Sequence, residues 1–319
     1  MHCKAVNGGE TTASKAMKIR LMTCLTAVVL TLAACGGDED FVAPSFLHVD
    51  AMTLTRSNTN PLDPDPGLYS AEIVSCYVEA LYKDSRKVET LGLFELPFTI
   101  PVLYSGEVEY LVFHPAIKIS GVSGMQTHYT FYNSDTLRNV SLQSGDTLRL
   151  DTLRTTYRIK SSNVLMFESF EPTRATIFFD SVEWRKHERD STLWGEGYGL
   201  VSVPDTETYV PFAINQSHTI TTARGSSIVY LELDHRSDLP FEVYMQSQYM
   251  SNSSTDVQRV MVVNPSKTWQ HMYINLGRTW EWFGYYPTFR LIFRALNIDG
   301  TGGSVRLDNV RVVTTTQTL

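Results

Sequence analysis

Hydrophobic and polar residues alternate with a period of two along almost the whole chain after residue 45. Successive side chains of a β-strand point to opposite faces, so this period predicts strands with one buried face. In the run Tyr69–Tyr82, one face carries Val74, Cys76, Val78, Ala80 and Tyr82. Further runs of this kind are Val229–Leu233, Phe241–Tyr249, Val257–Val263, Trp269–Leu276, Phe289–Leu296 and Ser304–Val313.

Turn-forming residues separate these runs at short intervals. Examples are Ser144-Gly145-Asp146, Asn264-Pro265-Ser266 and Asp299-Gly300. No helical period persists over three turns. Short alternating strands with such spacing predict an all-β protein of antiparallel sandwiches. A polar stretch at Lys160–Asn163 suggests a boundary between two tandem sandwiches, 46–160 and 161–319.

The first 34 residues have the features of an export signal, so they are set apart from the fold. Lys18 and Arg20 precede an apolar stretch, Leu21–Ala34, that is too short for a permanent membrane span. It ends in Leu32-Ala33-Ala34-Cys35, the pattern at which a lipoprotein signal is cleaved. We expect Cys35 to be the lipid-attachment residue; an ordinary secretory signal is the alternative.

Two details accompany this signal. Met17 is followed by the positive residues, so it is an alternative translation start, and 1–16 are then an upstream extension. After Cys35 come two glycines and the acids Asp38, Glu39 and Asp40. We expect 35–45 to be a solvated acidic tether. It resembles the acidic export tag of Bacteroidota-type lipoproteins, which implies the outer face of the outer membrane.

The charge excludes some partners. Removing residues 1–34 from the 319-residue chain would leave 285 residues with 23 basic and 33 acidic side chains, a net charge of about −10. Nucleic acid and anionic lipid headgroups require a basic face. We therefore expect neither as a partner. Cys76 would be the one cysteine besides Cys35, so an intrachain disulfide is not expected.

Motifs at the two ends of the second half carry a family resemblance. It opens with Phe167-Glu168-Ser169-Phe170-Glu171-Pro172 and closes with Val305-Arg306-Leu307-Asp308-Asn309-Val310. This resembles the jelly rolls of carbohydrate-binding modules, in which the first and last strands pair. The resemblance implies a structural calcium held by Glu171 and Asp308 with backbone carbonyls. The hydrophobic phase also slips at Asp308-Asn309, and a β-bulge without metal explains the same residues.

Aromatic side chains are the candidates for ligand contact, because sugar rings stack on flat rings. The candidates are Trp194, Trp280, Trp282, Tyr285 and Tyr286. The cluster at 280–286 lies between two predicted strands, so Trp280 and Trp282 could form an exposed platform or a core plug. For Trp269 and Tyr273, which alternate within a strand, we expect a place in the core.

Motifs of catalysis are absent from the sequence. It lacks a Gly-x-Ser-x-Gly elbow, a His-Glu-x-x-His pair, a phosphate-binding glycine loop and a Cys-x-x-Cys pair. A glycosidase would need two carboxylates at a set separation, which only a structure can show. We expect a protein that is not an enzyme.

The layout as a whole resembles uncharacterised two-domain outer-membrane lipoproteins of Bacteroidota-type bacteria. That resemblance implies a tether, a small immunoglobulin-like or regulatory-like β-domain and a C-terminal jelly roll. It also implies a cell-surface location with adhesion or assembly roles. Our leading interpretation is a non-catalytic, lipid-anchored surface protein whose jelly roll binds glycan or a protein partner. The alternative is a structural accessory of an outer-membrane secretion, motility or adhesion assembly.

Overall fold

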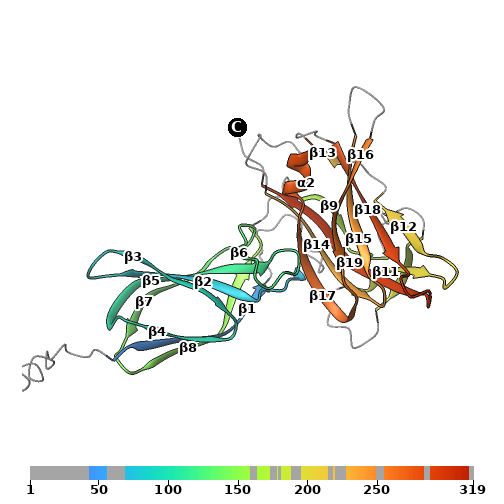
Figure 1. The fold of residues 1–319 in the computed structure, drawn as a ribbon. Coiled ribbons are helices and arrows are strands. Elements are labelled where there is room, and N and C mark those ends of the chain that lie inside the picture. The colour runs from blue at the N-terminus through green and yellow to red at the C-terminus, as the bar shows by residue number, and fades with distance from the viewer. Residues whose placement is uncertain are drawn as a thin grey trace, which may run out of the picture. The chain divides into compact units, whose positions relative to one another are not determined.

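The computed structural model describes ten stretches of the chain: 43–55, 69–158, 164–172, 178, 181–187, 195–214, 218–219, 228–248, 255–283 and 288–315. The expected signal peptide, Cys35 and nearly all of the expected tether lie outside these stretches. Residues 44–319 form one compact unit. It is all-β, apart from one short helix in the described part, and comprises two sandwiches (Figure 1). The predicted fold class is confirmed.

Eight strands build the N-terminal sandwich. They are β1 (Ser45–Thr55), β2 (Ser75–Tyr82), β3 (Val88–Glu95), β4 (Phe98–Val102), β5 (Gly106–Lys118), β6 (Gln126–His128), β7 (Asp135–Leu142) and β8 (Thr147–Thr156). One sheet has the order β4-β1-β8 and the other β3-β2-β5, with β6 and β7 both pairing with β5. β1 begins at Ser45, the residue that we expected to end the tether.

One pairing in this sandwich differs from the expected antiparallel pattern. β1 and β8 run parallel, with Phe46 opposite Thr147 and Thr55 opposite Thr156. A parallel pair needs a long connection, and strands β2 to β7 supply it. The alternation in β2 is as predicted, because Cys76, Val78, Ala80 and Tyr82 are buried.

The C-terminal jelly roll contains eleven strands and the helix among the described residues. They are β9 (Val164–Glu168), β10 (Glu183–Lys186), β11 (Gly197–Val203), β12 (Tyr209–Ala213), β13 (His218–Thr219), β14 (Val229–Ser237), β15 (Phe241–Gln248), β16 (Thr255–Val263), β17 (Ser266–Asn275), α2 (Gly277–Trp282), β18 (Thr288–Leu296) and β19 (Gly303–Thr314). The β19 sheet has the order β10-β11-β19-β14-β17, and β9 also pairs with β19. The β18 sheet has the order β12-β18-β15-β16, and β13 also pairs with β18.

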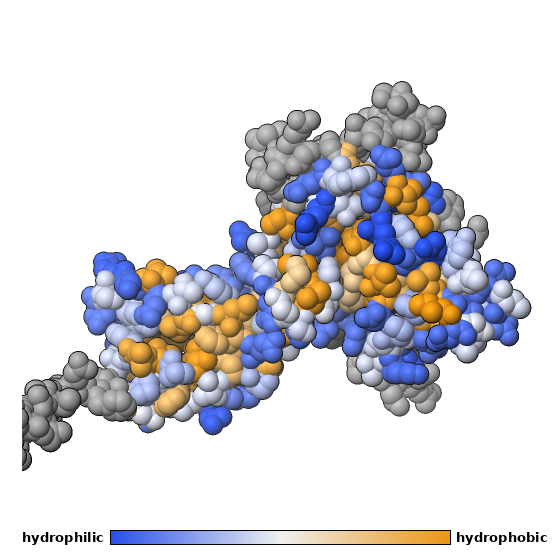
Figure 2. Space-filling model, in the orientation of Figure 1, coloured by the Kyte–Doolittle hydropathy of each residue, from blue (hydrophilic) through white to orange (hydrophobic). Residues whose placement is uncertain are grey.

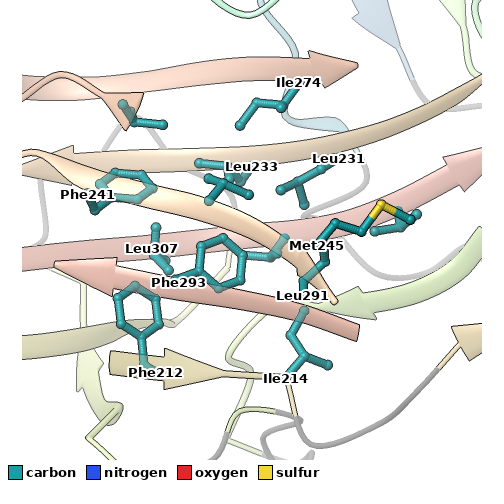
Figure 3. Close-up of a cluster of buried hydrophobic side chains, with 14 of the residues drawn as sticks. Phe212, Ile214, Leu231, Leu233, Phe241, Met245, Ile274, Leu291, Phe293 and Leu307 are labelled. Carbon is teal, nitrogen blue, oxygen red and sulfur yellow. The ribbon is translucent and has the colours of Figure 1, made fainter. Parts of the chain in front are cut away.

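Apolar side chains from the two jelly-roll sheets meet between the layers (Figure 3). The β19 sheet contributes Leu231, Leu233 and Leu307, and the β18 sheet contributes Phe241 and Phe293, all of them buried. Alternate residues of these strands therefore point away from the core, and they form the outer faces of the two sheets.

The expected pairing of the first and last jelly-roll strands is present, since Glu168 of β9 lies opposite Val310 of β19. The phase slip at Asp308-Asn309 is also a structural feature. Asn309 has a φ of 49°, and the register between β14 and β19 shifts there. The slip in the sequence thus marks a β-bulge.

The N-terminal sandwich covers part of the outer face of the β19 sheet. The hydroxyl groups of Tyr129 and Tyr157 donate hydrogen bonds to the Glu232 carboxylate on β14. The Arg311 guanidinium donates to the Ser70 carbonyl oxygen at 2.8 Å. Tyrosine rings from both sandwiches share one buried cluster around these bonds. This face of the jelly roll is therefore partly occupied by the chain itself.

The hydropathy of the surface and of the helix bears on where the protein can reside. Figure 2 shows hydrophobic and hydrophilic residues mixed over the visible face, with a broad hydrophobic area on the N-terminal sandwich. Among the described residues, no helix has both the length and the apolar character needed to cross a bilayer.

Candidate functional site

The outer face of the β18 sheet carries a row of aromatic and charged side chains. In β15, Phe241 and Val243 point into the core, so Glu242 and Tyr244 point outward. Glu242 lies opposite Arg294 of β18 in the strand register. On the far sides, β12 contributes Tyr209 and β16 contributes Arg259. The row therefore crosses β12, β18, β15 and β16.

The Glu242 carboxylate is the centre of this row. It accepts hydrogen bonds from Tyr244 Oη at 2.8 Å, from Arg259 Nη1 at 2.9 Å and from Arg294 Nε at 2.7 Å. The group is 3% exposed because the two arginines cover it. Burial would raise the pKa of Glu242, but the hydrogen bonds from Arg259, Tyr244 and Arg294 lower it. The carboxylate is therefore ionised at neutral pH and holds both cations in place.

Two tyrosine rings flank the Arg294 guanidinium. Its central carbon lies 5.1 Å from the ring centre of Tyr209 and 5.3 Å from that of Tyr244. Arg294 Nη2 also donates a hydrogen bond to Tyr244 Oη at 2.7 Å. Cations over aromatic faces at this range are attracted to them. The rings and the cation therefore hold one another in a defined arrangement.

This row has the chemistry of a surface that binds polyhydroxyl ligands. Tyr209 is 47% exposed, so a flat ring is open to solvent. Arg259 is 58% exposed beside the same carboxylate and offers N–H donors. Val257 and Val262 on the edge strand β16 are exposed as well. An apolar ring face next to fixed hydrogen-bonding groups suits a sugar, whose faces are apolar and whose rim is polar.

The aromatic residues expected from the sequence have different positions. Trp280 is 1% exposed and belongs to the jelly-roll core, so its ring offers no face to a ligand. Trp282, two residues later in α2, is 63% exposed. Trp194, Tyr285 and Tyr286 lie outside the described residues. Of the two core expectations, Tyr273 is buried and Trp269 is partly buried.

The two carboxylates expected to hold calcium have separate partners. The fully buried Asp308 has Oδ2 3.0 Å from His187 Nε2, and its Oδ1 accepts a bond from Asn309 N at 2.8 Å. Glu171 Oε1 instead accepts from Glu196 N at 3.0 Å. Within the described stretches, no group of three or more His, Cys, Asp and Glu side chains is placed to hold a metal. Nitrogen donors on both Asp308 oxygens do not fit a cation site, and calcium stays a prediction from the resemblance.

A serine, a histidine and an aspartate also meet at the interface between the sandwiches. His271 Nδ1 lies 2.7 Å from Asp234 Oδ1 and 3.4 Å from Ser70 Oγ. A nucleophilic triad uses opposite ring nitrogens for the acid and the serine. Here both face the same nitrogen, and all three side chains are buried. The cluster is therefore structural and does not form a hydrolytic triad.

Our sequence reasoning identified β15, β16 and β18 of this sheet, but it missed β12, which carries Tyr209, and the outward row. A usable signal was present, because Glu242 and Tyr244 occupy the polar phase of one run, and Arg290 and Arg294 that of another. The sequence did not show that β15 and β18 are adjacent in the sheet. Glu242 and Arg294 are 52 residues apart, and only the pairing of β15 with β18 joins them.

Comparison with known proteins gives fold likeness alone. No family model matches the chain. A search of curated proteins also finds no match. Among solved structures, a family 30 carbohydrate-binding module of a Clostridium thermocellum cellulosomal cellulase is 16% identical, covering 50% of this chain and 96% of its own, with a TM-score of 0.34.

Two further solved structures are similar to the same degree. A xylan-binding domain from Paenibacillus barcinonensis is 11% identical, covering 49% of this chain and 96% of its own, with a TM-score of 0.33. A carbohydrate-binding module of the β-sandwich superfamily, described for its promiscuous specificity, is 11% identical. It covers 85% of this chain and 98% of its own, with a TM-score of 0.36. These low values do not assign the chain to a family.

Proposed function

We propose that this chain is a non-catalytic surface lipoprotein whose jelly roll binds glycan on the outer face of the β18 sheet. The observation that carries the proposal is the row in which Arg294 lies between Tyr209 and Tyr244 and is held by Glu242. An acyl chain on Cys35 would keep this face at the outer membrane, where extracellular glycans are available. The row needs no cofactor to bind a sugar.

The row favours glycan binding for a physical reason. Its side chains are fixed by mutual hydrogen bonds and cation–π contacts before any ligand arrives. Little conformational entropy is then lost on binding, which favours affinity for small, strongly hydrated ligands. The exposed Tyr209 ring supplies stacking, and Arg259 and Arg294 supply donors for hydroxyl groups.

A glycan array probed with the full chain in detergent tests this proposal. We expect retention of one or more neutral polysaccharides, and about tenfold weaker binding for Tyr209→Ala and for Arg294→Ala, which corresponds to ~1.4 kcal/mol. Tyr110 and Arg138 form a matched control pair on the N-terminal sandwich, with the Arg138 guanidinium 4.6 Å from the Tyr110 ring centre. Tyr110→Ala and Arg138→Ala should leave binding unchanged. An array without signal would overturn the proposal.

A protein partner is the second candidate for the same face. Val257 is 46% exposed and Val262 is 39% exposed, both on the edge strand β16. An edge strand with exposed apolar side chains can pair with a strand of another protein. A stoichiometric partner that co-purifies from detergent-solubilised membranes, and is lost with Val257→Lys, would favour the assembly accessory over the glycan binder.

A further inference from the structure

A cleft of about 390 Å³ opens between the two sandwiches, away from the row on the β18 sheet. Its lining comes from the segment 127–130 on one side, and from β14, β17 and helix α2 on the other. The residues are Thr127, His128, Tyr129, Thr130, Ile228, Tyr230, Asn275, Gly277, Arg278 and Glu281. The volume lies within the range of roughly 300–1,000 Å³ typical of small-molecule sites.

The floor of the cleft is built from fixed side chains. The rings of Tyr129 and Tyr230 meet edge to face, with centroids 5.3 Å apart, and both are buried. The Tyr129 hydroxyl donates to the buried Glu232 carboxylate. Asn275 Oδ1 accepts a hydrogen bond from Gly277 N at 2.8 Å, which orients the amide. The shape of the floor is therefore set without a ligand.

Helix α2 supplies a polar and aromatic rim. Gly277 and Trp280 are buried, whereas Arg278, Glu281 and Trp282 are exposed. Residues at positions i, i+3 and i+4 lie on one side of a helix, so these three side chains share one side. The Trp282 ring makes an edge-to-face contact with the buried Phe283 ring, at 5.6 Å between centroids. A flat exposed ring thus stands next to two side chains that line the cleft.

The charges of the lining balance. Arg278 is positive and Glu281 is negative. Burial and the neighbouring His114 lower the pKa of His128, so its imidazole is neutral at neutral pH. Most of the remaining lining groups are hydroxyl, amide and aromatic. This combination suits a neutral polyhydroxyl ligand. An anionic ligand would be repelled by Glu281 and a cationic one by Arg278, and an apolar ligand would leave buried hydrogen-bond donors unpaired.

We propose that this cleft is a second glycan site, which takes the end of a neutral oligosaccharide, with Trp282 stacking on a sugar ring and Arg278, Glu281 and Asn275 binding its hydroxyl groups. The inference rests on the proposed glycan-binding function and adds a separate site to it. A sugar in the cleft touches both sandwiches, so its binding opposes their separation. It should therefore raise the melting temperature of the protein.

Calorimetry and thermal unfolding of the full chain in detergent test the proposal, with cellotriose, xylotriose, mannotriose and maltotriose as neutral probes and trigalacturonic acid as a charged probe. We expect at least one neutral trisaccharide to bind with a stoichiometry of two. Trp282→Ala and Arg278→Gln should each remove one of the two sites and the part of the rise in melting temperature that this site supplies. Arg294→Ala should remove the other site and leave the cleft's part of the rise in place.

The variants separate the failure of the two proposals. A stoichiometry of one that is lost with Arg294→Ala and unaffected by Trp282→Ala overturns the cleft and leaves the sheet site. A stoichiometry of one that is lost with Trp282→Ala and unaffected by Arg294→Ala overturns the sheet site and leaves the cleft. Tighter binding of trigalacturonic acid than of every neutral trisaccharide overturns the neutral ligand class. No binding of any probe overturns the cleft proposal.

Discussion

Arg311 Nε lies 2.7 Å from Glu232 Oε2, and both side chains are completely buried. The other carboxylate oxygen accepts hydrogen bonds from Tyr129 and Tyr157 of the N-terminal sandwich. This ion pair within the jelly roll is thus completed by groups from the other sandwich. Separating the sandwiches would remove those hydroxyl groups from a buried carboxylate, which is costly. The two sandwiches therefore behave as one structural unit.

Removing one member of this pair should destabilise the protein strongly. We expect Arg311→Met to lower the free energy of unfolding by about 3–5 kcal/mol, because Glu232 is left charged and buried. Adding Glu232→Gln should restore part of the loss, since the amide oxygen still accepts from the tyrosines and carries no charge. Urea unfolding measures both effects.

Arg185 provides the control for this prediction, because its ion pair with Glu183 is exposed. Arg185→Met should change the free energy of unfolding by less than about 1 kcal/mol. Equal losses for Arg311→Met and Arg185→Met would contradict our view of the interface.

The stability of the protein should fall on both sides of neutral pH. Burial would lower the pKa of His271, but the charge of Asp234 and hydrogen bonds with Asp234 and Glu232 raise it above 6.5. Its contribution is complete below pH 6.5 and is lost as the pH rises through the raised value. Burial would raise the pKa of Glu232, but Arg311 and the hydrogen-bond donors around it lower it to about 2. That contribution is complete above about pH 4.5 and is lost towards pH 2.

Urea unfolding across this pH range tests whether His271 causes the loss of stability above pH 6.5. In His271→Gln we expect the decline above pH 6.5 to flatten. The loss of stability at acid pH that belongs to Glu232 should remain, because Arg311 contributes most to lowering the pKa of that carboxyl. If the free energy of unfolding of this variant still declined as steeply above pH 6.5, the decline would belong to other groups.

The two tryptophans of α2 should respond in opposite ways to truncation. Trp280→Ala removes a core ring and should cost about 3–5 kcal/mol. Trp282→Ala removes an exposed ring and should change the free energy of unfolding by less than about 0.5 kcal/mol. Thermal and urea unfolding of the two variants provide the comparison, and a large loss in Trp282→Ala would show that its ring is buried in solution.

Lipid attachment should depend on a single thiol. Cells grown with radiolabelled fatty acid should label the wild-type protein, and Cys35→Ser should abolish both labelling and partition into the detergent phase. Cys76→Ser is the matched control, because this cysteine is buried in the N-terminal sandwich and its thiol has a pKa raised to about 12 by burial. Labelling that survives Cys35→Ser would refute the anchor.

The sequence by itself determined the strand content and the burial phase of this protein. Alternation is a local property, because neighbouring residues of a strand point to opposite faces whatever lies beyond them. The run around Val78 and the slip at Asp308-Asn309 could therefore be interpreted from the chain alone, and both agree with the structure.

Tertiary structure alone decided which outward side chains meet. Arg294 lies between Tyr209 and Tyr244 because β12, β18 and β15 are neighbours in one sheet, and Arg311 reaches Ser70 across 241 residues of chain. Trp280 and Trp282 are two residues apart, yet a short helix turns one into the core and the other to solvent. Strand order and helix rotation depend on packing between distant segments, and no local pattern encodes them.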